Sequence, residues 1–229
     1  MKFIVIEGLD GSGKSTQIEL VENYLAEKNI KSRFLHFPRP EAPFYGEMIA
    51  RFLRGELGPI DKVDPYLVAL LYAGDRNDAA GMINEWLSQG YAVIADRYLY
   101  SNIAFQCAKI KNIKEKDKLA HWIKDLEYNY NKIPVPDLNL FLKVPFKFTH
   151  SSLAKRRTGT DREYLLGSDD IHESDLDFQQ EVRNTYLWQV EENKDFEVID
   201  CEGQDESMLK PDEIFNKIKT RLNGILNIF

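Results

Sequence analysis

The first residues of the chain that could do chemistry begin at Gly8, soon after the apolar run FIVI. Residues 8–15 read GLDGSGKS and fit the spacing G-x-x-x-x-G-K-[ST], and a helical pattern follows them. Glycines let backbone N–H groups approach phosphate oxygens, and the helix adds N–H donors and the positive end of its dipole. Lys14 could reach the β- and γ-phosphates, and the Ser15 hydroxyl could bind Mg²⁺. We therefore predict a site for a nucleoside triphosphate and Mg²⁺. Its residues are Gly8, Leu9, Asp10, Gly11, Ser12, Gly13, Lys14, Ser15 and Thr16.

A carboxylate and a guanidinium follow the apolar run at residues 91–95, where Asp96-Arg97-Tyr98 ends a predicted buried strand. Ligands bind at the carboxyl ends of the strands in open parallel sheets. Asp96 could hold Mg²⁺ through its water shell or orient an attacking oxygen, and Arg97 could pair with a phosphate through two parallel hydrogen bonds. The alternative is an ordinary salt bridge, which is less favoured beside a phosphate-binding loop. We predict that both residues are catalytic and that Asp96 joins Ser15 at the metal.

A third cluster is basic and lies in residues 154–174, a polar segment with little periodicity. Loops of this length are usually functional or disordered. A lid that closes over the transferred phosphate brings positive charge to it and excludes water, the competing acceptor. A solvated run of charges is the alternative for any single residue, but we predict that the cluster as a whole belongs to a mobile lid. Its basic residues are Lys155, Arg156, Arg157 and Arg162.

Short β-rich runs alternate with helical patterns along the chain, which favours an α/β fold with a parallel sheet and helices on both faces. The predicted strands are residues 2–6, 32–37, 91–95, 138–144 and 196–200. The predicted helices are residues 15–29, 63–90, 174–193 and 210–226. The first, third and fourth strands are nearly continuous apolar runs, as expected for strands buried on both faces. We predict a single domain over residues 1–229 that includes the lid.

The overall composition limits the class of partner. The chain has 229 residues, 43% of them hydrophobic, which is enough for one sizeable core, and its formal net charge is −7. This charge argues against nucleic acid as the main partner, because there is no global basic field to attract it. Cys107 and Cys201 lie far apart, which disfavours a disulfide framework or a zinc site and favours a reducing compartment. With no signal-peptide pattern and no run of about 18 apolar residues, we expect a cytoplasmic protein that does not enter the membrane.

The phosphate-binding loop does not by itself say what happens to the nucleotide. A GTPase would need N-K-x-D after a late strand, but residues 193–196 read NKDF and end in the wrong residue. The switch-like D-x-x-G at residues 78–81 lies inside a helical pattern rather than at a strand end. A motor or DNA-directed ATPase would usually be larger and carry a hydrolytic Glu beside the strand-end Asp. These classes are therefore disfavoured.

The linked motifs resemble those of the thymidylate kinase family of nucleoside monophosphate kinases over residues 3 to about 222. They are IEGLDGSGKSTQ, HFPRP, LLYAGDR, VIADRYLYSNIAFQ and PDLNLFL. Many enzymes share the loop, but its combination with Asp96-Arg97-Tyr98, Ser101 and Ala104-Phe105-Gln106 is far more selective. The resemblance implies a doubly wound P-loop kinase fold with five strands in the order 2-3-1-4-5. It also implies transfer of phosphate from ATP–Mg²⁺ to dTMP, and a homodimer.

The resemblance further implies which residues hold the sugar and phosphate of the acceptor nucleotide. Asp10 resembles the carboxylate that accepts a hydrogen bond from the sugar 3′-hydroxyl, and Phe37 resembles the aromatic residue that lines the pocket. Arg97 resembles one arginine that clamps the acceptor phosphate. Arg39 resembles another, although it follows Pro38 directly and is offset from its position in some relatives.

The base would be bound by a second group of residues. Tyr72 takes the place of an aromatic residue that stacks on the base, and Arg76 that of the arginine that reads it. Thymine presents the acceptor O4 where cytosine presents an amino donor, so a donor from Arg76 favours thymine or uracil. Their difference of one methyl is worth about 1–3 kcal/mol in a fitted pocket, so some activity on dUMP is expected. Ser101 and Phe105 fall in the pocket wall. We expect Tyr98 to crowd a 2′-hydroxyl, with core packing as the alternative for these aromatic residues.

The chain departs from some family members at Gly11, where they carry an arginine. It resembles the members that supply the catalytic charge from the lid, to act with Lys14. The predicted lid residues in this role are Arg156, Arg157 and Arg162. Either residues 162–164 or residues 170–173 could match the family's lid-end motif. His172 is accordingly a site contact or, in the preferred interpretation, a surface residue.

Alternatives to dTMP phosphorylation stay open. A kinase for another nucleotide, or for a deoxynucleoside, would share the fold and differ in its acceptor. A non-catalytic P-loop module would bind nucleotide without turnover. A paralogue that has lost catalysis is disfavoured, because the expected charged positions are filled.

Overall fold

The computed structural model describes residues 1–149, 164–166, 170–172, 175–205 and 207–226. The strands are β1 (Phe3–Glu7), β2 (Ser32–His36), β3 (Ala92–Asp96), β4 (Leu138–Lys143) and β5 (Phe196–Asp200). The helices are α1 (Lys14–Glu27), α2 (Tyr45–Leu53), α3 (Pro65–Ser88), α4 (Leu99–Cys107), α5 (Ile113–Lys124), α7 (Leu176–Glu192) and α8 (Pro211–Leu226). A π-helical turn, η1 (Asp125–Tyr130), continues α5.

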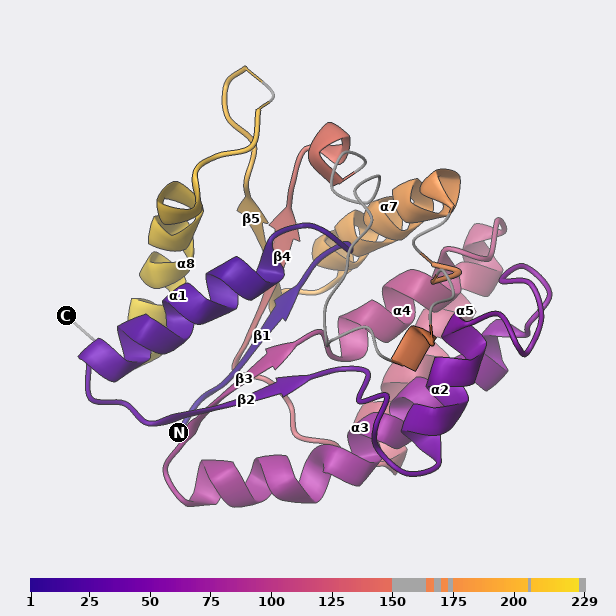
Figure 1. The fold of residues 1–229 in the computed structure, drawn as a ribbon, viewed down its shortest axis with the longest axis horizontal. Coiled ribbons are helices and arrows are strands. Elements are labelled where there is room, and N and C mark those ends of the chain that lie inside the picture. The colour runs from indigo at the N-terminus through magenta and orange to yellow at the C-terminus, as the bar shows by residue number, and fades with distance from the viewer. Residues whose placement is uncertain (150–163, 167–169, 173–174, 206, 227–229) are drawn as a thin grey trace.

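The five strands form one parallel sheet in the order β2-β3-β1-β4-β5 (Figure 1). Strand β1 lies in the middle, where Ile6 pairs with Asp96 of β3 and with Leu140 of β4. The phosphate-binding loop leaves the carboxyl end of β1 and Asp96 ends β3, so the register places the two predicted groups side by side. The predicted fold class and strand order are confirmed.

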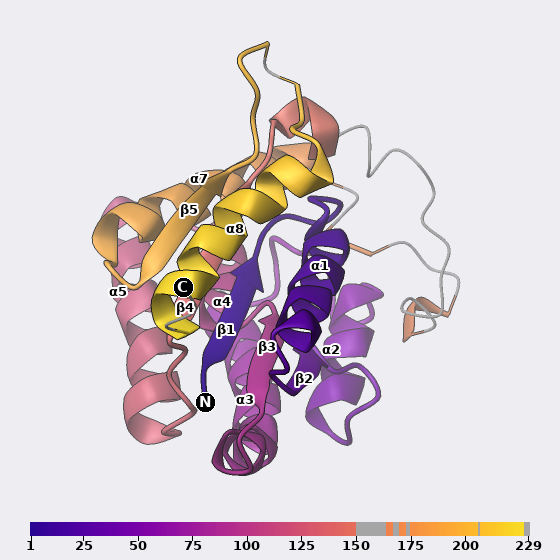
Figure 2. The same ribbon diagram turned by 90° about the vertical axis from the view of Figure 1, so that its left-hand side faces the viewer.

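Helices cover both faces of the sheet (Figures 1 and 2). The side chains of β1 alternate between the two layers. Phe3 and Val5 face the core formed with α3, α4 and α7, whereas Ile4 and Ile6 face the core formed with α1 and α8. All four side chains are completely buried. This explains why β1 reads as a continuous apolar run instead of an alternating one.

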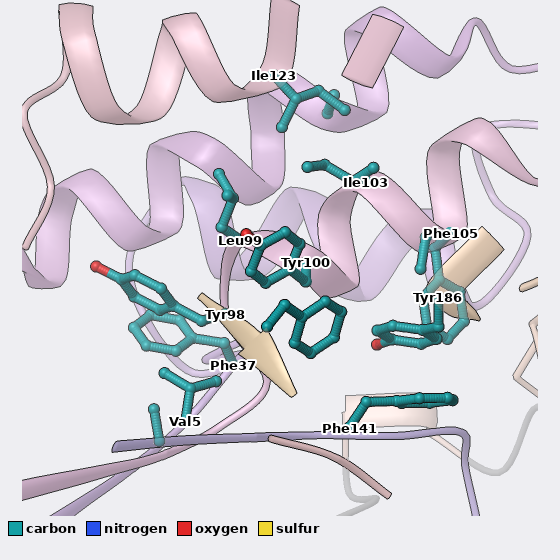
Figure 3. Close-up of a cluster of buried hydrophobic side chains, with 14 of the residues drawn as sticks. Val5, Phe37, Tyr98, Leu99, Tyr100, Ile103, Phe105, Ile123, Phe141 and Tyr186 are labelled. Atoms are coloured by element: carbon teal, nitrogen blue, oxygen red, sulfur yellow. The ribbon is translucent and has the colours of Figure 1, made fainter. Parts of the chain in front are cut away.

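A group of aromatic side chains fills the space between the sheet and α4 (Figure 3). The ring of Tyr98 lies 5.0 Å from that of Phe3 and 5.6 Å from that of Phe37, both edge-on, and its hydroxyl donates to the Pro134 carbonyl. Tyr98 is therefore part of the core. This burial fits the alternative interpretation of core packing, and the expectation that Tyr98 crowds a 2′-hydroxyl stays a prediction.

The strands lie within one residue of their predicted bounds at each end, but several helices were not expected. Sequence periodicity did not predict α2, α4, α5 or η1. Three of the four are short, since α2 and α4 have nine residues each and η1 has six. The helix expected from Ser174 begins at Leu176, where the Asp175 side chain caps it by accepting from Phe178 N. Most of the predicted lid, residues 154–174, lies outside the described residues.

None of the described helices combines the length and apolar character needed to cross a membrane. Cys107 and Cys201 are both buried and have free thiols. Burial raises the pKa of each thiol to about 12, so both are protonated at neutral pH.

Candidate active site

The phosphate-binding loop forms a turn that ends at the first residue of α1. Gly11 and Gly13 have φ angles of 71° and 83°, which residues with a Cβ rarely adopt. A Cβ on Gly8 would lie 2.7 Å from the hydroxyl of Ser12. Lys14 folds back over the loop and donates to the carbonyls of Gly8 and Leu9 at 3.3 and 3.0 Å. The loop therefore has the shape of a phosphate cradle, with the lysine inside it.

Lys14 and Asp96 face each other at the carboxyl edge of the sheet. The distance between Lys14 Nζ and Asp96 Oδ1 is 3.8 Å, and both side chains are buried. Burial and the nearby charge of Arg97 lower the pKa of Lys14, although Asp96 opposes this shift. Burial would raise the pKa of Asp96, but Lys14 and then His36, 3.3 Å from Oδ2, lower it below its ordinary value. Asp96 is therefore a stable anion.

The same place suits a divalent cation. Asp96 Oδ1 is buried and has no hydrogen-bond partner within the described part of the chain. Ser15 is the second residue of α1, and Ser15 and Asp96 both line the cavity over the phosphate-binding loop. Mg²⁺ is usually held by one or two protein oxygens together with phosphate oxygens and water. Asp96 and Ser15 therefore fit the predicted metal, which would neutralise phosphate charge.

Arg97 is fixed at the junction of two adjoining cavities. Its Nη2 donates to Asp10 Oδ1 at 2.9 Å and its Nη1 to Ser101 Oγ at 3.3 Å. Its guanidinium lies 4.9 Å above the ring of Phe105. Burial would lower the pKa of Arg97, but Asp10 and other nearby acids raise it, so the charge is permanent. Its φ of 68° is uncommon outside glycine, and such strain of about 1–3 kcal/mol persists where surrounding contacts impose it.

Ser101, which accepts from Arg97, also bonds to Glu7. Glu7 is a completely buried carboxylate that sequence reasoning did not single out. It accepts from Tyr98 N at 2.9 Å, from Ser101 N at 3.1 Å and from the Ser101 hydroxyl. The Tyr186 hydroxyl donates to it at 3.0 Å. Ser101 does line the predicted pocket, but its hydroxyl is already engaged by Glu7 and Arg97. Its position therefore suits holding Arg97 as much as touching a ligand.

The second cavity begins at Arg97 and extends between α2, α3 and α4. Of the residues predicted to bind the acceptor, the structure brings most to its wall. They are Asp10, Phe37, Tyr72, Arg76, Arg97, Ser101 and Phe105. Asp10, His36, Arg97 and Tyr164 line both this cavity and the one over the phosphate-binding loop. We call the group Asp10, Lys14, Asp96 and Arg97 the phosphate end. The base end is the group Tyr72, Arg76, Asn102, Phe105, Gln106 and His172.

Arg76 is held by an ion pair that the sequence did not predict. Its Nε and Nη2 donate to the two carboxylate oxygens of Glu127 at 2.5 and 2.7 Å, and both side chains are buried. Burial would lower the pKa of Arg76, but Glu127 raises it above its ordinary value. Glu127 lies in η1, and π-helical turns often occur at functional sites. With one N–H of Nε and one of Nη2 bound to Glu127, the donors left over are those of Nη1 and the second N–H of Nη2.

Two amide side chains complete the base end. Asn102 Nδ2 donates to Ala69 O at 3.1 Å and to Glu127 Oε1 at 2.9 Å, and both partners can only accept. The amide oxygen must therefore face away from them, and Oδ1 is buried without a partner among the described residues. Gln106 is also buried, and its Nε2 has no such partner. Both residues line the cavity.

Arg39 is not brought to the cavity wall. Its Nε donates to Asp75 Oδ1 at 2.8 Å, and its Nη2 donates to Asp78 Oδ2 at 2.6 Å. These bonds tie the segment after β2 to α3. A Cβ on Gly46 would lie only 2.1 Å from the Arg39 carbonyl, so the segment is tightly packed. In this structure Arg39 acts as a tether, and its predicted contact with the acceptor phosphate stays a prediction.

Two short described pieces of the predicted lid reach the site. Tyr164 donates to Asp170 at 3.2 Å, and both line the acceptor cavity together with His172. The preferred interpretation of His172 as a surface residue is wrong. It is 5% exposed and its ring lies 4.8 Å from Phe105 and 5.5 Å from Phe178. Burial and the positive charges of Lys109 and Arg97 lower its pKa to about 3. The lid arginines predicted to be catalytic, Arg156, Arg157 and Arg162, lie outside the described residues.

Comparison with known proteins identifies the family. The thymidylate kinase family model matches residues 6–222. The chain belongs to the thymidylate kinase family. The thymidylate kinase of Carboxydothermus hydrogenoformans is 34% identical over 227 residues, which is 98% of each chain. The probable thymidylate kinase of Thermococcus kodakarensis is 30% identical over 205 residues, covering 87% of this chain and 89% of that one. The predicted family and the prediction of an enzyme are confirmed.

A solved structure agrees in fold. The thymidylate kinase of Candida albicans superposes with a TM-score of 0.71 over 99% of this chain and 92% of that chain, at 24% identity. At this identity the match supports the parallel sheet and its helices and says nothing of individual site residues.

Glu7, Asn102, Gln106 and Glu127 are the residues of this thymidylate kinase family site that sequence reasoning missed. Asn102 and Gln106 lie inside a quoted motif, as buried polar residues of a largely apolar helix, and that was a usable signal. Glu7 directly precedes the phosphate-binding loop at the end of a buried strand. Glu127 carried no signal, because the surrounding segment DLEYNY has no clear periodicity.

Proposed function

We propose that the protein transfers the γ-phosphoryl group of ATP to dTMP. The observation that carries this proposal is the junction of two cavities at Asp10 and Arg97. One cavity is lined by the phosphate-binding loop, and the other by aromatic and amide side chains suited to a nucleobase. A donor phosphate in the first and an acceptor phosphate in the second would meet beside Arg97.

The phosphate end supplies positioning and charge. Lys14 leaves the loop carbonyls and binds the phosphates of ATP, while Asp96 and Ser15 hold Mg²⁺. Arg97 clamps the acceptor phosphate and Asp10 accepts a hydrogen bond from the sugar 3′-hydroxyl. Phosphoryl transfer asks little covalent chemistry of a protein, so holding the two oxygens in line and neutralising charge supply most of the rate.

The base end supplies selectivity for thymine over cytosine. Asn102 presents an acceptor and Gln106 presents a donor. Thymine offers the N3–H donor and the O4 acceptor to such a pair, whereas cytosine offers an N3 acceptor and an amino donor. Each pairing would be mismatched with cytosine, and a buried polar group left unpaired costs about 1–3 kcal/mol. Tyr72 stacks on the base, and Arg76, braced by Glu127, supplies a further donor.

Further parts of the proposal concern the lid and the assembly. In this proposal residues 154–174 serve as a lid within a single domain, and Arg156, Arg157 and Arg162 bring charge to the transferring group and exclude water. The protein works as a homodimer in the cytoplasm. Exposed apolar side chains on α3, with Leu67 61% and Leu70 42% exposed, support a self-associating face. Light scattering on the purified protein tests the dimer.

The decisive experiment is a coupled assay of ADP release with ATP–Mg²⁺ and separate acceptors. The acceptors are dTMP, dUMP, dCMP, UMP, AMP, dGMP and thymidine. We expect strong turnover of dTMP, weaker turnover of dUMP and little of dCMP, with all of it lost in Lys14→Ala, which exposes contaminating kinases. Preference for another monophosphate would keep phosphoryl transfer and overturn the choice of acceptor. Binding of ATP without turnover of any acceptor would make the chain a nucleotide-binding module.

A further inference from the structure

The amide of Gln106 is oriented by a neighbour outside the cavity wall. Gln106 lies in the last turn of α4, and Lys109 follows three residues later. Lys109 Nζ donates to Gln106 Oε1 at 2.8 Å. The Gln106 side chain is 1% exposed, and the part of the chain that the structure describes offers no partner to Nε2.

This contact leaves the amide only one orientation. An ammonium group has three donors and no acceptor, so the atom that it touches must be the amide oxygen. The NH₂ group must then lie on the other side of the amide. Gln106 would present its oxygen to the cavity only after losing the bond to Lys109.

The surroundings of Lys109 hold its ammonium group beside the Gln106 amide. Its Nζ lies 4.8 Å above the ring of Phe52, which holds the end of the side chain. Burial lowers the pKa of Lys109 to about 8, and Asp64 opposes the shift. At neutral pH, below this value, the group is mostly an ammonium, which has no acceptor and therefore fixes the orientation of the Gln106 amide.

We propose that Lys109 is a positioning residue that sets the preference for dTMP over dCMP by fixing the Gln106 amide with its donor toward the base. The inference rests on the proposed function. The residue touches no substrate and acts through Gln106. In its absence the amide can rotate, and its oxygen can then accept from the 4-amino group of cytosine.

The test compares Lys109→Met with Lys109→Arg on dTMP and dCMP. The methionine keeps the length of the side chain and removes the donor. We expect the ratio of kcat/KM for dTMP over that for dCMP to fall about tenfold in Lys109→Met, the loss expected for one hydrogen bond. In Lys109→Met the KM for dTMP should rise while kcat stays nearly unchanged. Lys109→Arg keeps a donor and should retain most of the ratio of kcat/KM values. Lys111→Met, an exposed lysine two residues away, is the matched control.

A second variant keeps the inference testable if Lys109→Met does not fold. Gln106→Glu places acceptors on both sides of the group while Lys109 stays paired, and it should lower the same ratio by about tenfold or more. In the wild-type protein, 4-thio-dTMP, whose sulfur is a weaker acceptor than O4, should bind more weakly than dTMP. Lys109→Met should reduce this difference.

The outcomes separate the inference from the function on which it rests. A wild-type protein that does not phosphorylate dTMP would overturn the proposed function. A wild-type preference for dTMP that stays the same in Lys109→Met and in Gln106→Glu would overturn only the inference. A lower melting temperature of Lys109→Met with an unchanged ratio would make Lys109 a structural residue and would likewise overturn it.

Discussion

The phosphate end and the base end of the site differ in how the chain builds them. The phosphate end comes from two short segments that leave neighbouring parallel strands, the loop after β1 and the end of β3. The base end is collected from α3, α4 and the short piece at residues 170–172, and η1 supports it from behind. The first depends on local sequence and sheet register, and the second on the packing of elements distant in sequence.

The difference extends to the electrostatics. At the phosphate end, Lys14 lies 3.8 Å from Asp96 and Arg97 bonds to Asp10 at 2.9 Å, and these paired charges line the cavity over the phosphate-binding loop. At the base end, the charges of Glu127 and Lys109 lie behind the cavity wall and bond to the side chains that line it. Charge serves catalysis at one end and orientation at the other. Substitutions at the phosphate end should therefore mainly lower kcat. Substitutions at the base end should mainly change the KM for dTMP, the choice of substrate and the stability of the fold.

The largest effect is expected at the phosphate end. Lys14→Met should lower kcat by about 10³-fold or more, because it removes a preorganised positive charge from the transferring group. Binding of dTMP, which the other end dominates, should change little. Steady-state kinetics and calorimetric titration with dTMP measure the two quantities.

Lys28→Met is the matched control, since Lys28 is exposed just beyond the last turn of the same helix. A loss of dTMP affinity in Lys14→Met as large as its loss of kcat would contradict the separation of the two ends.

The next effect concerns the support of the base end. Glu127→Ala leaves the guanidinium of Arg76 buried without its carboxylate and removes a partner of Asn102. Breaking a buried ion pair from one side costs about 3–5 kcal/mol, so the free energy of unfolding should fall by that amount. The KM for dTMP should rise as well, since both side chains lose their orientation. Urea unfolding and steady-state kinetics measure these changes.

Asp125→Ala provides the comparison, because Asp125 lies in the same turn but is exposed. Equal stability of Glu127→Ala and Asp125→Ala would show that the ion pair does not support the base end in solution.

What sequence alone could predict follows the same division. Short motifs were enough to predict the positions of the loop glycines, Lys14 and Asp96. Local backbone geometry and the ends of the strands determine where these residues lie, largely independently of the rest of the chain. Glu127 could not be predicted in this way, since its partner Arg76 lies 51 residues earlier and meets it only through the packing of α3 against η1. His172 was misjudged for a similar reason. The sequence left open which segment ends the lid, and it did not show the neighbours of His172 in space, which are Phe52, Phe105 and Phe178.

The burial of His172 predicts a dependence of stability on pH. Its pKa is lowered to about 3 in the folded protein, whereas an unfolded histidine titrates near 6.5. Between these values the unfolded chain binds a proton that the folded chain does not. The stability that the protein gains from keeping His172 neutral is therefore fully present above pH 6.5. The free energy of unfolding decreases as the pH falls from 6.5 toward 3. At pH 5 the loss should be about 2 kcal/mol.

His172→Gln should remove this part of the pH dependence, as measured by urea unfolding between pH 5 and 7.5. His121→Gln should not, because the His121 side chain is 75% exposed. Parallel pH curves for the wild type and His172→Gln would mean that the ring is accessible to solvent.

The smallest effect should fall on selectivity, at Asn102. Asn102→Ala removes the acceptor that Glu127 and Ala69 turn toward the cavity, so the kcat/KM ratio of dTMP over dCMP should fall by about tenfold. The same substitution loses two hydrogen bonds and should lower the melting temperature. Stability alone cannot change the ratio of two substrates measured on the same enzyme, so the ratio isolates the base contact. Asn184→Ala, exposed on α7, should leave both quantities unchanged. An unchanged ratio in Asn102→Ala would leave Arg76 and Gln106 as the groups that distinguish thymine from cytosine.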